Sequence, residues 1–267
     1  MQKNIESKAH FDEHPLSWTF HRNTCRWAHN AQESSGSDDV PEPGAEYPDL
    51  PYTPLPEPQA IKEKFDDLIN RRCSCRDFSD APISQDAIAT ILHYGYGILG
   101  TDHWGTAEFL ERPVPSGGGM YPLELYLLTR RVTNLEDGIY HYAPLSHGLE
   151  QVRAVTLPDP LIRYLFMGQY PVLTAAAIVI ISAAPGRSMK KYGDRGYRYM
   201  LFEAGHIAQN MNLAACALGL ETLNLGGFFD DEINRLCGAK RDEQLPLYAV
   251  AIGRGVSNSK HRLRFSE

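Results

Sequence analysis

The chain has 267 residues, 43% of them hydrophobic, and a formal net charge of −7. This length and composition suit a folded domain with a sizeable core and argue against a disordered or fibrous protein. The acidic balance argues against nucleic acids and anionic membranes as partners, and the absence of a signal-like or long apolar segment predicts a cytoplasmic protein.

Residues 1–58 are rich in proline, which favours extended backbone over helix or packed strand. We expect an N-terminal extended arm over 1–58, lying across a body formed by 59–267. The aromatic side chains of Trp18, Phe20 and Trp27 indicate that part of this arm docks on an apolar surface. A dimer partner is one candidate for that surface.

After Pro58, apolar residues recur at helical spacing from Ile61 to Ile69 and predict a helix. A second helix is predicted in PISQDAIATILHYGYGIL, with Ser84 as its N-cap. The segments that follow, LELYLLTRR, GIYHYAP and HGLEQV, are predicted to be strands of one sheet.

The run AAAIVIISAA is continuously apolar, as expected for a central strand buried on both faces. A long helix is predicted from Tyr197 to Leu218, ended by Gly219. ETLNLGGF, DDEINRLCG and LYAVAIG then predict a strand, a short helix and a last strand. Without regular βαβ repeats or a GxGxxG motif after a first strand, the order favours an α+β fold over a Rossmann domain.

The first candidate site is RRCSCRDF, where Arg72, Ser74 and Arg76 alternate. In extended backbone these three side chains point to the same side, so they can converge on one phosphate. A solvated helix terminus explains the same residues equally well. The tail SKHRLRF, with Lys260 and Arg262, is a second basic segment, for which a solvated tail is the alternative.

The second candidate site is RPVPSGGGMYPLE, in which Gly117, Gly118 and Gly119 can present backbone N–H groups without obstruction. Such a loop suits a flat heteroaromatic ligand, and a flexible surface turn is the alternative. In the long helix, one stripe mixes polar groups into a face that packing alone would fill with apolar residues, and such polar groups need partners. The stripe consists of Glu203, His206, Gln209, Asn210 and Leu213. The five cysteines form no zinc-like pair of pairs, so no metal site and no disulfide framework are predicted.

Together these segments resemble the nitroreductase superfamily, and within it the SagB-type azoline dehydrogenases. RPVPSGGGMYPLELY is similar to the signature Pro-Ser-Gly-Gly-Ala-x-Tyr-Pro-x-Glu of that branch, with Gly119 in place of the usual Ala. KYGDRGYRYMLFEAGHIAQN resembles its Lys-Tyr-x-x-Arg-Gly-Tyr-Arg segment and the Glu-x-Gly-x-x-x-Gln-Asn helix that follows. RRCSCRDF and SKHRLRF are shared with nitroreductases generally, although Cys73 stands where a basic residue is frequent.

The resemblance implies a nitroreductase-like fold, with a central, mostly antiparallel sheet flanked by helices. It also implies a homodimer with FMN at the subunit interface. The implied FMN-binding residues are Arg72, Ser74, Arg76, Pro115, Ser116, Gly117, Gly118, Gln209, Asn210, Gly226, Gly227, Lys260 and Arg262. Lys191 and Tyr192 match the pair that acts on substrate.

The activity implied is oxidation of a thiazoline or oxazoline ring, in a peptide or carrier-bound substrate, to thiazole or oxazole. FMN N5 would accept the hydride, Lys191 or Tyr192 the proton, and dioxygen would be the final oxidant. A cyclodehydratase complex is a possible partner. The alternatives are another FMN oxidoreductase of the same fold, such as an NAD(P)H-dependent nitro or quinone reductase or a desaturase, and a flavin-free scaffold subunit of a peptide-modifying complex.

Overall fold

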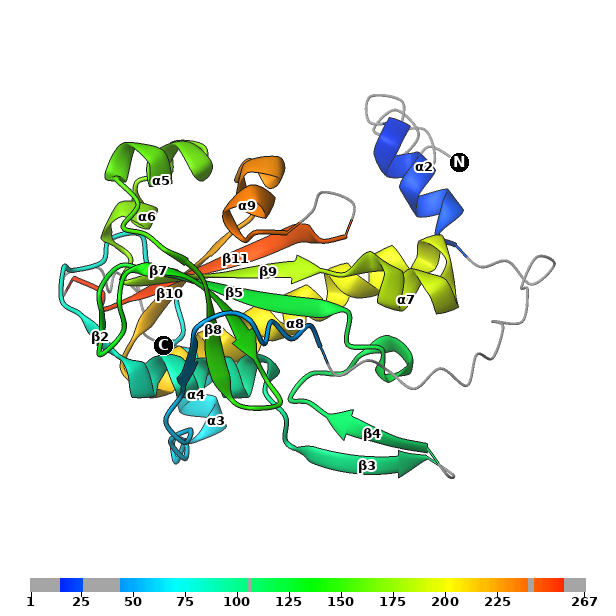
Figure 1. The fold of residues 1–267 in the computed structure, drawn as a ribbon, viewed down its shortest axis with the longest axis horizontal. Helices are drawn as coiled ribbons and strands as arrows, with labels where there is room; N and C mark the ends of the chain where they lie inside the picture. Colours follow the sequence, from blue (N-terminus) through cyan, green and yellow to red (C-terminus); the bar gives the residue numbers. More distant parts are fainter. Residues whose placement is uncertain (1–14, 26–43, 105–106, 240–242, 257–267) are drawn as a thin grey trace, which may run out of the picture.

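A computed structural model describes residues 15–25, 44–104, 107–239 and 243–256 (Figure 1). Lys260, Arg262 and Trp27 lie outside these ranges. Within the described part of the chain, no helix combines the length and apolar character needed to cross a bilayer. The same residues contain no cluster of three or more His, Cys, Asp or Glu side chains arranged to hold a metal ion.

A seven-stranded sheet forms the centre of the molecule, in the order β1-β8-β7-β5-β9-β11-β10. All neighbouring strands in it are antiparallel. The strands are β1 (Tyr52–Pro54), β5 (Leu123–Thr129), β7 (Gly138–Ala143), β8 (Gly148–Ala154), β9 (Ala177–Ala183), β10 (Glu221–Leu225) and β11 (Leu245–Gly253). Two small pairs complete the strands: β2 (Ile83–Ser84) with β6 (Val132–Thr133), parallel, and β3 (Gly100–Trp104) with β4 (Ala107–Glu111), antiparallel.

Helices cover both faces of the sheet (Figure 1). The helices are α2 (Pro15–Asn23), α3 (Phe65–Arg71), α4 (Gln85–Tyr96), α5 (Asp159–Leu165), α6 (Pro171–Thr174), α7 (Pro185–Tyr192), α8 (Asp194–Ala217) and α9 (Asp230–Leu236). One core packs against α4 and α8, and the other packs against α5, α6 and α9. Strand β9 serves both cores, because Val179 faces the first and Ile178 the second. The predicted α+β class and the buried central strand are confirmed.

Two helix boundaries follow from local chemistry. The Ser84 side chain accepts a hydrogen bond from the Ala87 N–H at 3.2 Å, so it caps α4 as predicted. Gly219, just beyond α8, has φ +70°, the left-handed conformation expected after a helix. Helix α8 itself begins at Asp194, earlier than the predicted Tyr197.

The helix predicted from Ile61 is shorter than expected. It begins only at Phe65, and within it Leu68 is buried while Phe65 and Ile69 are exposed. Ile61 nevertheless packs against the core, from a segment without regular structure. The apolar residues from Ile61 to Ile69 therefore do not form one helical face. Leu68 is buried from within the helix, and Ile61 packs on the core from the segment before it.

The expectation of extended backbone throughout 1–58 is wrong at Pro15–Asn23, which forms α2. Proline is tolerated in the first turn of a helix, so Pro15 can begin one. The end of this segment contacts α8: Phe20 lies edge-to-face with Tyr197 at 5.9 Å, and Thr24 is bonded by Arg195 and Arg198. Strand β1 pairs with β8 inside the main sheet, and the boundary at residue 58 stays a prediction.

Candidate active site

The glycine loop, Pro115–Gly119, lies between β4 and β5 and ends in a single 3-10 turn over Gly117–Gly119. Gly118 and Gly119 have φ values of +64° and +67°, a conformation that strains residues with a side chain. Ser116 begins the turn and its Oγ accepts the Tyr121 N–H at 2.9 Å. The positive φ values favour glycine at positions 118 and 119, so these residues contribute to the shape of the loop and not only to its flexibility.

Lys191 and Tyr192 end helix α7 directly against this loop. A Cβ added to Gly118 would overlap the Tyr192 hydroxyl and lie 3.0 Å from Lys191 Nζ. The Tyr192 ring packs edge-to-face on Tyr199 of α8, with 5.1 Å between centroids, and Tyr199 in turn borders Gly117. The structure thus brings together the predicted catalytic pair and the predicted glycine loop.

Glu203, on α8, lies beneath the loop and is only 2% exposed. It accepts a hydrogen bond from Tyr96 Oη at 2.8 Å and another from the Ser116 side chain. Burial raises the pKa of Glu203 to about 7, and the bonds from Ser116 and Tyr96 and the charge of Arg112 only partly oppose this rise. The Glu203 carboxyl, which changes charge near neutral pH, therefore contacts the loop through Ser116.

The two amides predicted on α8 differ in their surroundings. Asn210 Nδ2 donates to the Pro113 carbonyl oxygen at 3.2 Å, which joins α8 to the segment before the glycine loop. Gln209 is exposed, and its Oε1 accepts from Asn212 Nδ2 at 3.4 Å. Asn210 therefore contacts the segment that enters the glycine loop, while Gln209 is exposed.

The predicted phosphate residues form a separate group near the start of β10. Arg72 directly follows α3 as its C-cap and lines a small cleft of about 90 Å³ together with Asn212. Ser74 forms a parallel bridge with Thr222, and Ser74 and Arg76 are exposed. Two buried oxygens on residues lining this cleft, Asn212 Oδ1 and Glu221 Oε2, have no hydrogen-bond partner among the described residues.

These two groups lie at different ends of α8. Tyr199, beside the glycine loop, and Asn212, beside Arg72, are 13 residues apart in one helix, which corresponds to roughly 20 Å along its axis. A single chain therefore presents two separate half-sites. One, the loop cluster, is the glycine loop with Lys191, Tyr192 and Glu203, and the other, the arginine cleft, is the cleft lined by Arg72 and Asn212.

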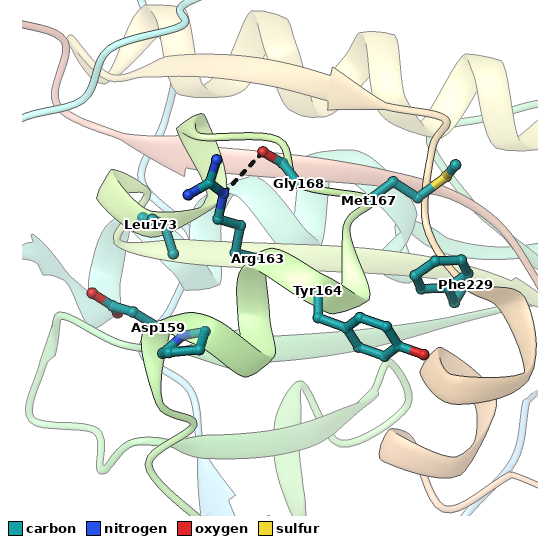
Figure 2. Close-up of a pocket in the computed structure, with 8 residues that line it drawn as sticks. Asp159, Arg163, Tyr164, Met167, Gly168, Leu173 and Phe229 are labelled. Carbon is teal, nitrogen blue, oxygen red and sulfur yellow. Dashed lines mark hydrogen bonds between the residues drawn. The ribbon is translucent and has the colours of Figure 1, made fainter.

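Gly226 and Gly227 form the turn after β10, where the Gly227 carbonyl oxygen accepts from Gln169 Nε2 at 2.7 Å. A Cβ added to Gly227 would lie 3.6 Å from Met167 Sδ, and Met167 lines a wide apolar hollow of about 690 Å³ between α5 and α9. Tyr164, Met167 and Phe229 line the hollow, while Arg163 bonds the Gly168 carbonyl oxygen at 3.3 Å (Figure 2). The hollow is thus next to one predicted flavin turn.

Sequence reasoning missed a buried ionic cluster that borders the loop cluster, formed by Glu124, His141, Glu150 and Arg187. A signal was present, because Glu124 and His141 are charged or titratable residues inside otherwise apolar strands. Such residues need partners when buried. The partners come from other strands and from α7, and no sequence pattern named them.

Comparison with known proteins supports the resemblance. The family model for the nitroreductase family matches residues 69–254. The chain is 34% identical over 202 residues to the candidate nitroreductase MJ1384 of Methanocaldococcus jannaschii, covering 76% of this chain and 96% of that protein. It is 32% identical over 149 residues to the microcin B17-processing protein McbC of Escherichia coli, covering 54% of each.

A solved structure shares the fold. The Escherichia coli microcin synthetase McbBCD complex with truncated pro-MccB17 contains a chain that matches with a TM-score of 0.60 and 24% identity, covering 89% of this chain and 86% of that one. This chain therefore spans nearly the whole of one curated relative and about half of the other. The nitroreductase-like fold is confirmed.

Proposed function

This chain belongs to the nitroreductase family, and on that premise we propose that it is an FMN-dependent azoline dehydrogenase. Its substrate would be a thiazoline or oxazoline ring in a peptide or carrier-bound molecule, and its product the thiazole or oxazole. The observation that carries this proposal is the contact of Lys191 and Tyr192 with the glycine loop at Gly118. The similarity to McbC, a microcin B17-processing protein, supports a peptide substrate.

The residues of the two half-sites fit FMN. Arg72 offers a guanidinium for the phosphate, with Ser74 and Arg76 in the same segment. The unpartnered oxygens of Asn212 and Glu221, which line the cleft beside Arg72, suit a ligand that brings hydroxyl donors. The glycine loop offers unobstructed backbone next to Lys191 and Tyr192. Bound FMN supplies the hydride acceptor for the reaction, with dioxygen as the final oxidant.

The chain itself supplies the base. Lys191 Nζ and Tyr192 Oη both lie at Gly118, so either group, in its deprotonated form, can accept the proton that leaves the ring Cα while the substrate lies over the loop. Tyr199 supports the Tyr192 ring, and Ser116 and Glu203 support the loop. The protein's part is therefore to hold the proton acceptor and the substrate in one geometry.

We further propose a homodimer in which one flavin site uses the glycine loop of one subunit and the arginine cleft of the other. The separation of roughly 20 Å along α8 supports this division of the site. The solved McbBCD complex, in which a protein of this fold occurs with other chains, supports a partner such as a cyclodehydratase as well.

The test compares Lys191→Ala and Tyr192→Phe with Lys190→Ala, the neighbouring lysine on α7, which is exposed. Loss of a general base is expected to lower azoline turnover by about 10²–10⁴-fold in one of the first two variants, with visible flavin absorbance retained. Lys190→Ala should keep both turnover and flavin. Unchanged turnover in both test variants would refute the base assignment, and a colourless wild-type protein would refute the flavin assignment.

A second candidate function is reduction of nitroaromatics or quinones with NAD(P)H, because the chain covers 96% of a candidate nitroreductase at 34% identity. Rapid bleaching of the flavin by NADPH without oxygen would favour this reductase. Slow bleaching by NADPH, combined with rapid bleaching by an azoline peptide, would favour the dehydrogenase.

A further inference from the structure

A line of charged side chains crosses the central sheet from β8 to β5. His141, on β7, is fully buried, and its Nδ1 lies 2.7 Å from Glu150 Oε2 of β8. Its Nε2 lies 3.0 Å from Glu124 Oε2 of β5. Since each ring nitrogen faces a carboxylate, both nitrogens must donate, and the arrangement suits a protonated imidazole.

Two tyrosine rings surround His141, those of Tyr47 and Tyr126, at 4.9 and 5.2 Å between centroids. Burial alone would lower the pKa of His141, but the bonds to Glu124 and Glu150 raise it above its ordinary value. Two carboxylates therefore face one buried cation within the sheet. One further positive charge would balance the cluster.

Arg187 supplies that charge. Its guanidinium forms a 2.6 Å ion pair with Glu124 Oε1 and lies 3.5 Å from the Tyr121 carbonyl oxygen. The Ala45 N–H also donates to Glu124 Oε1, at 2.8 Å. Arg187 thus links the buried ionic cluster to the segment that leaves the glycine loop.

Arg187 also lies on the helix that carries the proposed base. In α7 it precedes Lys191 by four residues, so the two side chains share one helix face, and Tyr192 follows at the end of the helix. Helix α7 has only eight residues and lacks a side-chain N-cap. A short helix of this kind depends on tertiary contacts for its placement.

Stability alone does not explain this cluster, because well-packed apolar side chains often stabilise a core as much as buried ions. The distinctive feature of the cluster is the position of Arg187 at its edge. Through one guanidinium it contacts both α7, which carries Lys191 and Tyr192, and the backbone after the glycine loop. Glu124 is also the last residue of the segment Pro115–Glu124 that carries the sequence signature.

We infer that Arg187, held by Glu124, is a positioning residue that sets Lys191 and Tyr192 against the glycine loop. This inference rests on the proposed function for its effect on turnover, and on the geometry alone for its effect on α7. A displacement of about 1 Å at a reacting group can lower a rate by about 10²-fold. Loss of the Arg187–Glu124 pair is expected to act on kcat in this way.

The experiment compares Arg187→Gln, Arg187→Lys and Glu124→Gln with Arg130→Gln as a matched control. Arg130 is similar in burial, its side chain being 15% exposed against 12% for Arg187. It also binds a carboxylate and a backbone carbonyl, those of Asp159 and Leu173, but not on α7. The measurements are kcat and KM for an azoline peptide, flavin content, Tm, and hydrogen exchange of the amides in 185–192.

We expect Arg187→Gln and Glu124→Gln to lower kcat by about 100-fold with little change in KM, to keep bound flavin, and to speed exchange in 185–192. Arg187→Lys should recover most of kcat. Arg130→Gln should lower Tm while leaving kcat within about twofold and exchange of α7 unchanged.

Unchanged α7 exchange in Arg187→Gln, or an equal kcat loss in Arg130→Gln, would overturn the inference. If the wild-type protein binds flavin but turns over no azoline, the proposed function fails on its own. The exchange comparison still decides whether Arg187 positions α7 in that case.

Discussion

Two buried carboxyl groups, those of Glu203 and Glu124, lie close to the glycine loop and differ in the charge of the groups that bind them. Glu203 and Glu124 are each 2% exposed. Glu203 is bonded by two neutral hydroxyls, and Arg112, the nearby cation, stacks on the Tyr96 ring at 4.3 Å. Glu124 instead is paired directly with His141 and Arg187.

Their pKa values differ accordingly. Burial raises the pKa of Glu203 to about 7, because hydroxyl donors offset only part of the lost hydration. Burial also acts to raise the pKa of Glu124, but the His141 bond and the Arg187 charge outweigh it, and the pKa is lowered. Equal burial therefore leaves one carboxyl able to exchange a proton near neutral pH and fixes the other as an anion.

The largest expected effect comes from breaking the ionic cluster at its centre. His141→Leu leaves Glu124 and Glu150 buried without their shared cation, which should lower the free energy of unfolding by about 3–5 kcal/mol. Urea denaturation at pH 6 measures the loss. The triple variant with Glu124→Gln and Glu150→Gln should recover part of it, and a loss below about 1 kcal/mol in His141→Leu would contradict the assigned ion pairs.

Wild type and His141→Leu also test how the free energy of unfolding depends on pH. The pKa values of Glu124 and Glu150 are lowered from 4.5, so the stability they contribute is present above pH 4.5 and is lost as pH falls through their folded values. The pKa of His141 is raised from 6.5, so its contribution is present below pH 6.5 and is lost as pH rises through the folded value. The difference between wild type and His141→Leu should therefore be largest between these two limits.

A smaller pH effect, opposite in sign to that of Glu124 and Glu150, is expected at Glu203, and Glu203→Gln tests it. Because the pKa of Glu203 rises from 4.5 to about 7, the associated stability is present below pH 4.5 and is lost as pH rises through about 7. The loss amounts to at most about 3 kcal/mol. Denaturation at pH 5 and pH 8 should show the variant gaining on wild type at the higher pH, and parallel curves would show that Glu203 does not titrate there.

The smallest effect is expected at the surface. Arg71 and Glu63 form a 3.1 Å pair with side chains 51% and 42% exposed. Glu63→Gln should change the free energy of unfolding by less than about 1 kcal/mol, because solvent screens such pairs. If Glu63→Gln lowered the free energy of unfolding as much as His141→Leu does, burial would not determine how much an ion pair contributes to stability.

Local chemistry explains which parts of the fold were predictable. The Ser84 cap, the buried strand β9 and the turn at Gly219 each depend on a few neighbouring residues, and all three agree with the structure. The short helix α2 did not follow from composition, because the prolines that suggested extended backbone lie mostly later, from Pro41 onward.

The sequence by itself determined the α+β class, the family and the segments that carry the candidate site, because these depend on patterns within continuous stretches. Only the tertiary structure decided that Lys191 and Tyr192 meet Gly118 and that Arg187 meets Glu124. It also decided that the glycine loop and Arg72 lie toward different ends of α8. Each of these facts joins residues from distant segments, and the packing of α7 and α8 on the sheet sets which side chains come within contact distance.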